Sequence, residues 1–214
     1  MNHIQEINNY RKILNNKLIE ITGSSKHLKK IISYIKLLLE KNRELNLISR
    51  QLAIEEILSS HIIDCLAGCK YFQDYNSITD LGSGGGLPGI ILAILFPNKK
   101  LTLIEKSPKK SDFLSEVKNK INLKNANIVN SLVSEKEIKT DVVTCRAFKD
   151  INTILTLTKN FLKKNGVYIL YKARIEKINE ELLIANKHFK FDSNIYKIDE
   201  IKEKERHIVI IRGL

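Results

Sequence analysis

Apolar residues recur every three or four positions through the first seventy residues, the spacing of helices with one buried face. We expect one helix over residues 4–21 and another over 28–39, separated by a Gly-Ser-Ser break at residues 23–25. A third run with the same spacing covers residues 54–69. The pattern therefore predicts an N-terminal helical cap over residues 1–70.

Beyond residue 70 short apolar runs, typical of buried strands, alternate with helical spacing, which predicts a doubly wound α/β sheet over residues 71–214. Strands are expected at residues 77–81, 101–104, 126–129, 141–144 and 166–171, and helices at 89–96, 107–121, 154–162 and 176–189. Two extended runs, 191–198 and 207–211, then follow each other without a helix between them. That succession favours a hairpin and an antiparallel last strand.

The turn after the first strand consists almost wholly of glycine: Asp80-Leu81-Gly82-Ser83-Gly84-Gly85-Gly86-Leu87-Pro88-Gly89. Glycine lets a backbone turn sharply and lie close to a ligand. Gly84, Gly86 and Gly89 fit the G-x-G-x-x-G dinucleotide fingerprint. Gly82, Gly84 and Gly86 fit instead the G-x-G-x-G spacing of enzymes that use S-adenosylmethionine (SAM).

Glu105 ends the second predicted strand, about 20 residues after the glycines, where an acid accepts hydrogen bonds from a ribose diol. This pairing favours a nucleoside-type cofactor over a bare strand-to-helix turn. The loop is not a phosphate-binding Walker loop, because Ile90 and Ile91 stand where Lys-Ser/Thr is required.

The net charge of +12 and the sequence pI near 9.5 are unevenly distributed. Residues 1–50 carry a net charge of +6, residues 51–98 carry −4, residues 99–124 carry +5 and residues 125–214 carry +5. An AT-rich genome also enriches lysine, but without such segregation. A basic surface around a less basic loop favours an RNA partner.

No apolar run approaches the ~20 residues of a membrane span, and the first residues contain no signal-peptide core. The odd number of cysteines, three, argues against a disulfide framework and for a reducing compartment. We expect a cytoplasmic monomer.

His61, Cys65 and Cys69 share one face of a predicted helix, which raises the alternative of a metal site. Three ligands spaced four residues apart on one helix do not close a tetrahedral site. We therefore expect the cysteines to be packing residues and no metal site. His61 and Asp64 are expected to form a buried polar pair that links the cap to the sheet.

Several blocks of this sequence resemble the RsmG (GidB) family, bacterial SAM-dependent methyltransferases that act on guanine N7 in 16S ribosomal RNA. The resemblance rests on the glycine block together with Asn46-Leu47-Ile48-Ser49, His61-Ile62-Ile63-Asp64, Thr102-Leu103-Ile104-Glu105, Arg146-Ala147-Phe148, Tyr171-Lys172 and Glu205-Arg206-His207-Ile208-Val209. It covers the chain from about residue 46 to 211. It implies a class I SAM-methyltransferase (Rossmann-like) fold.

The resemblance also implies roles for individual residues. The SAM site would comprise Gly82, Gly84, Gly86, Leu87, Glu105, Val133, Ser134 and Arg146. Arg146 would also be the catalytic residue, lying between the cofactor and the target base, and Lys172 and Arg206 would contact RNA. The chain departs from the family pattern at Ser60, Cys65, Cys145 and Ala173, and the segment 131–134 lacks the usual Arg and acid.

The chemistry of the fourth strand end agrees with N7 as the target. An exocyclic amine acceptor usually requires an Asn/Asp-Pro-Pro-aromatic turn, whereas the turn here is Cys145-Arg146-Ala147-Phe148. Cys145 raises the alternative of a thiolate nucleophile for cytosine C5, although a cysteine at a strand end is more often a packing residue. Guanine N7 has a free lone pair, so positioning alone suffices.

Two other functions stay open from the sequence. A nicotinamide-dependent oxidoreductase would use Gly84, Gly86 and Gly89, but it lacks a recognisable catalytic set and the paired final strands oppose it. A basic RNA-binding protein with a relict cofactor loop would bind no cofactor.

Overall fold

The structure, a computed structural model, describes residues 3–49, 53–199 and 205–214. Within these ranges a seven-stranded sheet has the order β3-β2-β1-β4-β5-β7-β6. The strands are β1 (Ser77–Leu81), β2 (Lys100–Glu105), β3 (Ala126–Asn130), β4 (Thr140–Arg146), β5 (Leu162–Lys172), β6 (Asp192–Lys197) and β7 (His207–Arg212). Strands β1 to β5 are parallel, and β7 lies antiparallel between β5 and β6. The predicted parallel sheet and antiparallel final strand are confirmed.

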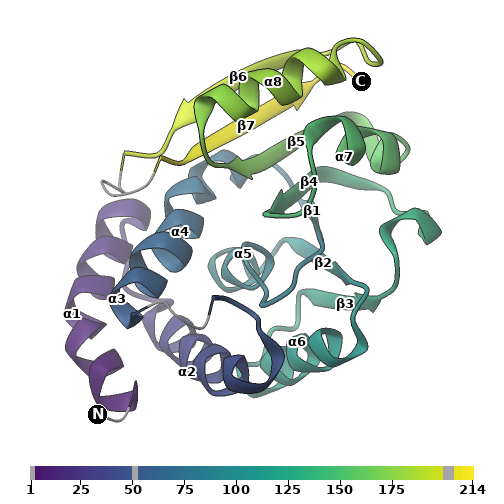
Figure 1. The fold of residues 1–214 in the computed structure, drawn as a ribbon. Helices are drawn as coiled ribbons and strands as arrows, with labels where there is room; N and C mark the ends of the chain where they lie inside the picture. Colours follow the sequence, from purple (N-terminus) through teal and green to yellow (C-terminus); the bar gives the residue numbers. More distant parts are fainter. Residues whose placement is uncertain (1–2, 50–52, 200–204) are drawn as a thin grey trace.

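Helices cover both faces of the sheet, which explains why all five residues of β1 are buried. Alternate residues of that strand point to opposite faces: Ile78 joins the apolar cluster under α5 (Gly89–Leu95) and α6 (Pro108–Lys120). Leu81 joins the cluster under α7 (Ile151–Thr158) and α8 (Ile175–Ala185). Figure 1 shows α5 and α6 on one side of the sheet and α7 and α8 on the other.

The N-terminal helices α1 (His3–Thr22) and α2 (Leu28–Leu45) lie on the α5 side of the sheet (Figure 1). Buried residues such as Leu18 and Leu38 belong to the same apolar cluster as residues of α5 and α6. The expected cap thus shares its core with the sheet. A division of the chain at residue 70 stays a prediction.

The third predicted helix is present but irregular. It begins as α3 (Ile54–Ile57), widens into a π-helical segment η1 (Leu58–Ile63), continues as α4 (Asp64–Gly68) and ends in the tight turn η2 (Cys69–Phe72). Such π-helical widening inside a helix is frequent at functional sites. Here it contains His61, which lines a cavity. None of the described helices is long and apolar enough to cross a membrane.

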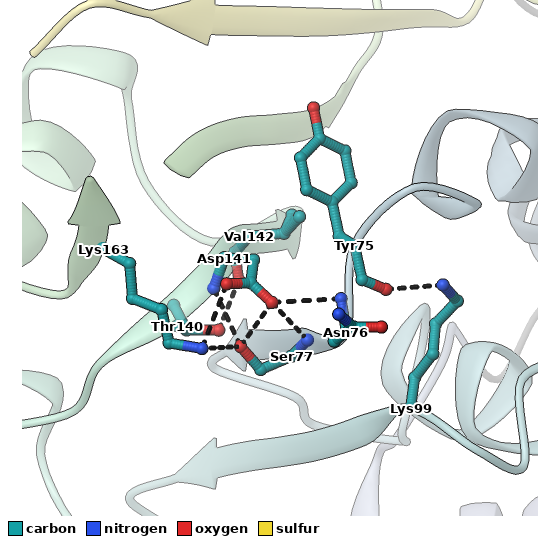
Figure 2. Close-up of polar contacts among 8 residues, drawn as sticks. All are labelled: Tyr75, Asn76, Ser77, Lys99, Thr140, Asp141, Val142 and Lys163. Atoms are coloured by element: carbon teal, nitrogen blue, oxygen red, sulfur yellow. Dashed lines mark hydrogen bonds and ion pairs between the residues drawn. The ribbon is translucent and has the colours of Figure 1, made fainter. Parts of the chain in front are cut away.

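A polar cluster fixes the amino ends of the central strands (Figure 2). The Asp141 carboxylate accepts hydrogen bonds from the backbone N–H groups of Asn76 and Ser77 at 3.0 and 2.7 Å and from the Ser77 hydroxyl at 2.8 Å. Lys163 of β5 forms an ion pair with its other oxygen at 3.0 Å. This cluster ties β1, β4 and β5 together at the end of the sheet opposite the glycine turn.

Candidate active site

A cavity of about 610 Å³ lies at the carboxyl ends of β1, β2 and β4, over the glycine turn. Ligand crevices of open α/β sheets form at this end of the strands, and the volume is in the range of small-molecule sites. Most of the predicted site residues line it: Gly82, Gly84, Leu87, Glu105, Val133, Ser134 and Arg146. The structure thus brings together residues that are up to 64 positions apart in the sequence.

The glycine turn forms the floor of this cavity, with its backbone in a conformation that L residues avoid. Gly84 has φ +55°, and an added Cβ would meet only the Gly82 carbonyl oxygen, at 3.8 Å, so the space beyond it is open. At Gly82 a Cβ would collide with the ring of Phe148. Glycine is therefore required twice here, once for the turn and once for the approach of the 146–148 segment.

Tyr34 of α2 supports the turn from below. Its buried hydroxyl donates a 2.7 Å hydrogen bond to the carbonyl oxygen of Gly85. The end of α2 supports the wall, because the Asn42 side chain accepts hydrogen bonds from the N–H groups of Leu47 and Ile48, which line the cavity. Tyr34 was not predicted as a site residue, because its position on an apolar helix face is that of an ordinary core residue.

Gly86 is placed differently from its predicted role in cofactor binding. It is not among the lining residues, and a Cβ at this position would press on Ile90 and Leu114 in the core. Its φ of +97° shows why glycine stands there. Gly86 therefore shapes the turn from behind the cavity wall.

Glu105 is 6% exposed and connects the turn to the end of β2. One carboxylate oxygen accepts a hydrogen bond from the N–H of Gly84 and the other from the N–H of Ser107, both at 2.8 Å. Each oxygen keeps a further lone pair that can accept from a ligand hydroxyl. The side chain is thus held rigidly where it borders the cavity.

The segment after β3 supplies an apolar wall. Val133 is buried within a single turn, η3 (Val133–Glu135), and Leu132 beside it stays 47% exposed although it lines the cavity. Leu132 and Ser134 fall in the stretch that lacks the family's usual Arg and acid. An exposed leucine at a cavity mouth was not predicted, because isolated apolar residues in loops carry no periodicity.

Arg146 is held on its other side by the N-terminal helices. Its guanidinium donates to Asp64 at 2.9 Å, to the backbone carbonyl of Ser60 at 2.8 Å and to Nδ1 of His61 at 2.7 Å. Because arginine only donates, His61 accepts at Nδ1. The predicted link from His61 and Asp64 to the sheet is present, but His61 is half-buried rather than buried, and each of the two side chains binds Arg146.

Asp64 lies between two arginines and is 1% exposed. Besides Arg146, its carboxylate faces Arg206 Nε at 3.7 Å. Burial raises the pKa of Asp64, and the two guanidinium groups act in the opposite direction without cancelling this effect.

A second cavity of about 520 Å³ adjoins the first, and both are lined by residues 146–149. Lys172 and Arg206, the predicted RNA contacts, line this second cavity together with Asp64 and Glu181. The Lys172 ammonium forms an ion pair with Glu181 at 2.6 Å and donates to the carbonyl of Lys149 at 2.9 Å. Lys172 is therefore anchored to the protein, a pairing that the spacing of its motif did not reveal.

Two other groups near the strand ends are buried. Cys145 is 1% exposed, and burial raises the pKa of its thiol to about 12, so the thiolate required of a nucleophile is not formed at neutral pH. Asp80 lies beneath the glycine turn, accepts from the N–H of Gly89 at 3.1 Å, and has its pKa raised to about 7 by burial. Cys65 and Cys69 are members of the apolar core.

Comparison with known proteins agrees with this geometry. The family model "rRNA small subunit methyltransferase G" (GidB) matches residues 27–209. A protein of Brachyspira hyodysenteriae named ribosomal RNA small subunit methyltransferase G is 42% identical over 206 residues, covering 95% of this chain and 99% of that protein. A protein of Bdellovibrio bacteriovorus named ribosomal RNA small subunit methyltransferase G 1 is 43% identical over 188 residues, covering 86% of this chain and 90% of that protein.

Solved structures show the fold alone. An O-methyltransferase from Bacillus cereus, solved in complex with SAH, has a TM-score of 0.58 at 15% identity and covers 85% of this chain and 91% of its own. A SAM-dependent methyltransferase from Aquifex aeolicus has a TM-score of 0.58 at 14% identity, with coverages of 74% and 93%. The class I methyltransferase fold is confirmed, and a nicotinamide-dependent oxidoreductase is not supported. This chain belongs to the rRNA small subunit methyltransferase G (GidB) family.

Proposed function

We propose that this methyltransferase transfers a methyl group from SAM to N7 of a guanine in 16S rRNA. The observation that carries the proposal is the pair of adjoining cavities that share the wall 146–149. The first has the size and the glycine floor of a nucleoside cofactor site, and the second is lined by basic side chains. A methyl donor in the first and a base in the second would meet at Arg146.

The first cavity suits SAM residue by residue. Gly84 leaves space for close approach of a ligand to the backbone, and Gly82 leaves space for the ring of Phe148 at the same turn. Glu105 is held so that its free lone pairs can accept from the ribose hydroxyls. Val133 and Leu87 offer apolar contacts to a ligand, and Ser134, next to Val133, offers a hydroxyl. SAM, when bound, supplies an electrophilic methyl group.

The acids around the two cavities favour an acceptor that has no proton to lose. Of the described acids that line them, Glu105 and Asp64 are engaged as described above, Glu181 accepts from Lys172 and from the N–H of Ile151, and Asp150 caps α7. Each of these acids already accepts from the protein, although Oδ1 of Asp64 has no hydrogen-bond partner among the described residues, and Cys145 stays protonated. Guanine N7 attacks with its own lone pair, so the protein needs only to position the base.

Arg146 would orient the guanine. Arginine reads the major-groove edge of guanine at O6 and N7. Because N7 must stay free for methylation, the contact falls on O6. Its guanidinium is already fixed by Asp64, Ser60 and His61, which limits the entropy lost on binding.

The proposal extends to the context of the enzyme. Arg206 and the anchored Lys172 would bind phosphate or the base edge, and the enzyme would act as a cytoplasmic monomer with a cap over residues 1–70 and a SAM-binding domain over 71–214. Three buried cysteines without disulfides fit a reducing compartment.

The test is transfer of labelled methyl from SAM to small ribosomal subunits that lack the modification, followed by reduction and aniline cleavage, which cuts RNA at 7-methylguanosine. We expect label and a single cleavage. Label without cleavage would refute N7 as the target, and no label on subunits or naked rRNA would refute the substrate. In parallel, Arg146→Ala should lower methyl transfer more than SAM affinity, with Lys164→Ala as the surface control.

A further inference from the structure

A groove of about 430 Å³ lies at the amino ends of β2 and β3, at the end of the sheet opposite the SAM cavity. It is lined by Lys99, Lys100, Lys118 and Lys124 and by three asparagines, and its described lining contains no acid. Four lysines around one shallow groove repel one another unless an anion lies between them. The proposed methyl transfer does not use this groove.

Three of these lysines are available to a ligand. Lys99 is used by the protein, since its ammonium donates to the carbonyls of Gln73 and Tyr75; Figure 2 shows the second contact. Within the described ranges, Lys100, Lys118 and Lys124 form no ion pair. Lys100 and Lys124 are exposed and Lys118 is half-buried.

Helix α6 connects this groove to the SAM cavity. Lys106, just before the helix, and Lys110, in its first turn, line the SAM cavity, whereas Lys118, in its last turn, lines the groove. A helix of 13 residues is about 20 Å long. Residues 106–125 hold six lysines against two acids, one of which, Glu116, is paired with Lys120 at 2.8 Å. The lysines therefore cluster at the two ends of α6, three at each end, and both acids lie between them.

We propose that the groove of Lys100, Lys118 and Lys124 binds phosphates of the RNA backbone at the far end of α6 from the SAM cavity, about 20 Å away along the helix. This rests on the proposed function and adds a second contact to it. A free phosphate or nucleotide would contact the lysines at one end of α6 only. A phosphodiester chain carries charges along its whole length and can contact the lysines at both ends. The substrate is then a folded RNA that runs along α6 and around the β3 edge of the sheet.

The test compares two triple variants with the same charge change. The groove variant removes the three available lysine charges and is Lys100→Gln/Lys118→Gln/Lys124→Gln. The control variant removes three lysine charges at exposed positions away from the groove and is Lys164→Gln/Lys187→Gln/Lys190→Gln. Binding to in-vitro-transcribed 16S rRNA and the KM for methylation are measured between 50 and 300 mM salt. For the groove variant we expect a salt slope smaller by about one per lysine, a KM at least about ten-fold higher, and unchanged kcat and SAM affinity.

Each outcome decides the proposal. An equal slope and KM in the two triple variants would overturn the second contact, even with methyl transfer intact. If the wild-type enzyme transfers no methyl, the proposed function fails, but the binding slopes still decide the second contact. If the groove variant melts at a lower temperature than the wild type, cross-linking of wild-type protein to the rRNA replaces the comparison of variants. Cross-links at residues 118–124 support the second contact, and their absence overturns it.

Discussion

Gly84→Ala isolates the contact between the glycine turn and the cofactor. The left-handed φ of +55° makes any L residue unfavourable there, by about 1–2 kcal/mol of folding free energy. The new methyl group meets no protein atom closer than the Gly82 oxygen at 3.8 Å, so it enters the cavity. Crowding of a well-packed contact costs about 1–3 kcal/mol, which corresponds to about 5- to 150-fold in the dissociation constant for SAM. Isothermal titration calorimetry measures that constant directly.

Gly23→Ala is the matched control, because Gly23 has φ +71° and no atom within 4 Å of an added Cβ. It lies between α1 and α2, away from the residues that line the cavity. Both variants should lose a similar free energy of unfolding, but only Gly84→Ala should lose SAM affinity. Wild-type affinity in Gly84→Ala, or an equal loss in both variants, would refute the reasoning.

Three further substitutions test one carboxylate that lines the SAM cavity, one that ties the amino ends of the strands together and one buried beneath the glycine turn. Glu105→Gln puts an amide donor against a backbone N–H and should weaken SAM binding by about 1–3 kcal/mol in calorimetry; near-normal affinity would remove the residue from the site. Asp141→Asn should lower the free energy of unfolding at pH 7, and the deficit should shrink as pH falls below 3.8. Partial burial raises the pKa of Asp141, but hydrogen bonds from Lys163 and Ser77 lower it more. The contribution of Asp141 to stability is therefore present above the ordinary pKa of 3.8 and is lost as pH falls through the lower folded pKa. A deficit that does not depend on pH would contradict this. Asp80→Asn should flatten the pH dependence of stability. The raised folded pKa of about 7 makes the wild type lose stability as pH rises from about 4 to 7. If the free energies of unfolding of wild type and variant, from chemical denaturation, change in parallel with pH, Asp80 is not the titrating group.

The apolar pattern predicted the strands of the sheet well, because their burial determines that pattern. The first five strands lie where the apolar runs placed them, since a parallel strand covered on both faces has no polar side to blur the pattern. The helix over 54–69 was predicted as continuous, whereas η1 interrupts it. A π-helical segment of six residues differs too little from an α-helix in apolar spacing to be seen in sequence. Helix α8 ends at Ala185 rather than near residue 189, an ordinary uncertainty of helix ends.

The candidate site was predictable where a motif occupies one loop, and not where distant segments meet. Glycines and an acid at fixed spacing identified Gly84 and Glu105. The pairing of Lys172 with Glu181 depends on how β5 and α8 are juxtaposed, which no local pattern encodes. The same holds for Phe148, whose ring lies over Gly82 only because the end of β4 returns to the turn after β1.

The N-terminal segment also contributes directly to the site. It holds the glycine turn through Tyr34 and the carbonyl of Gly85, and it holds Arg146 through Asp64 and His61. Without residues 1–70, Arg146 would lose three hydrogen-bond acceptors and the turn would lose a support. Because a misplacement of about 1 Å can cost a hundred-fold in rate, these contacts bear on methyl transfer as well as on stability. Because the N-terminal segment and the sheet share one apolar core, the glycine turn and Arg146 are held in fixed positions relative to each other.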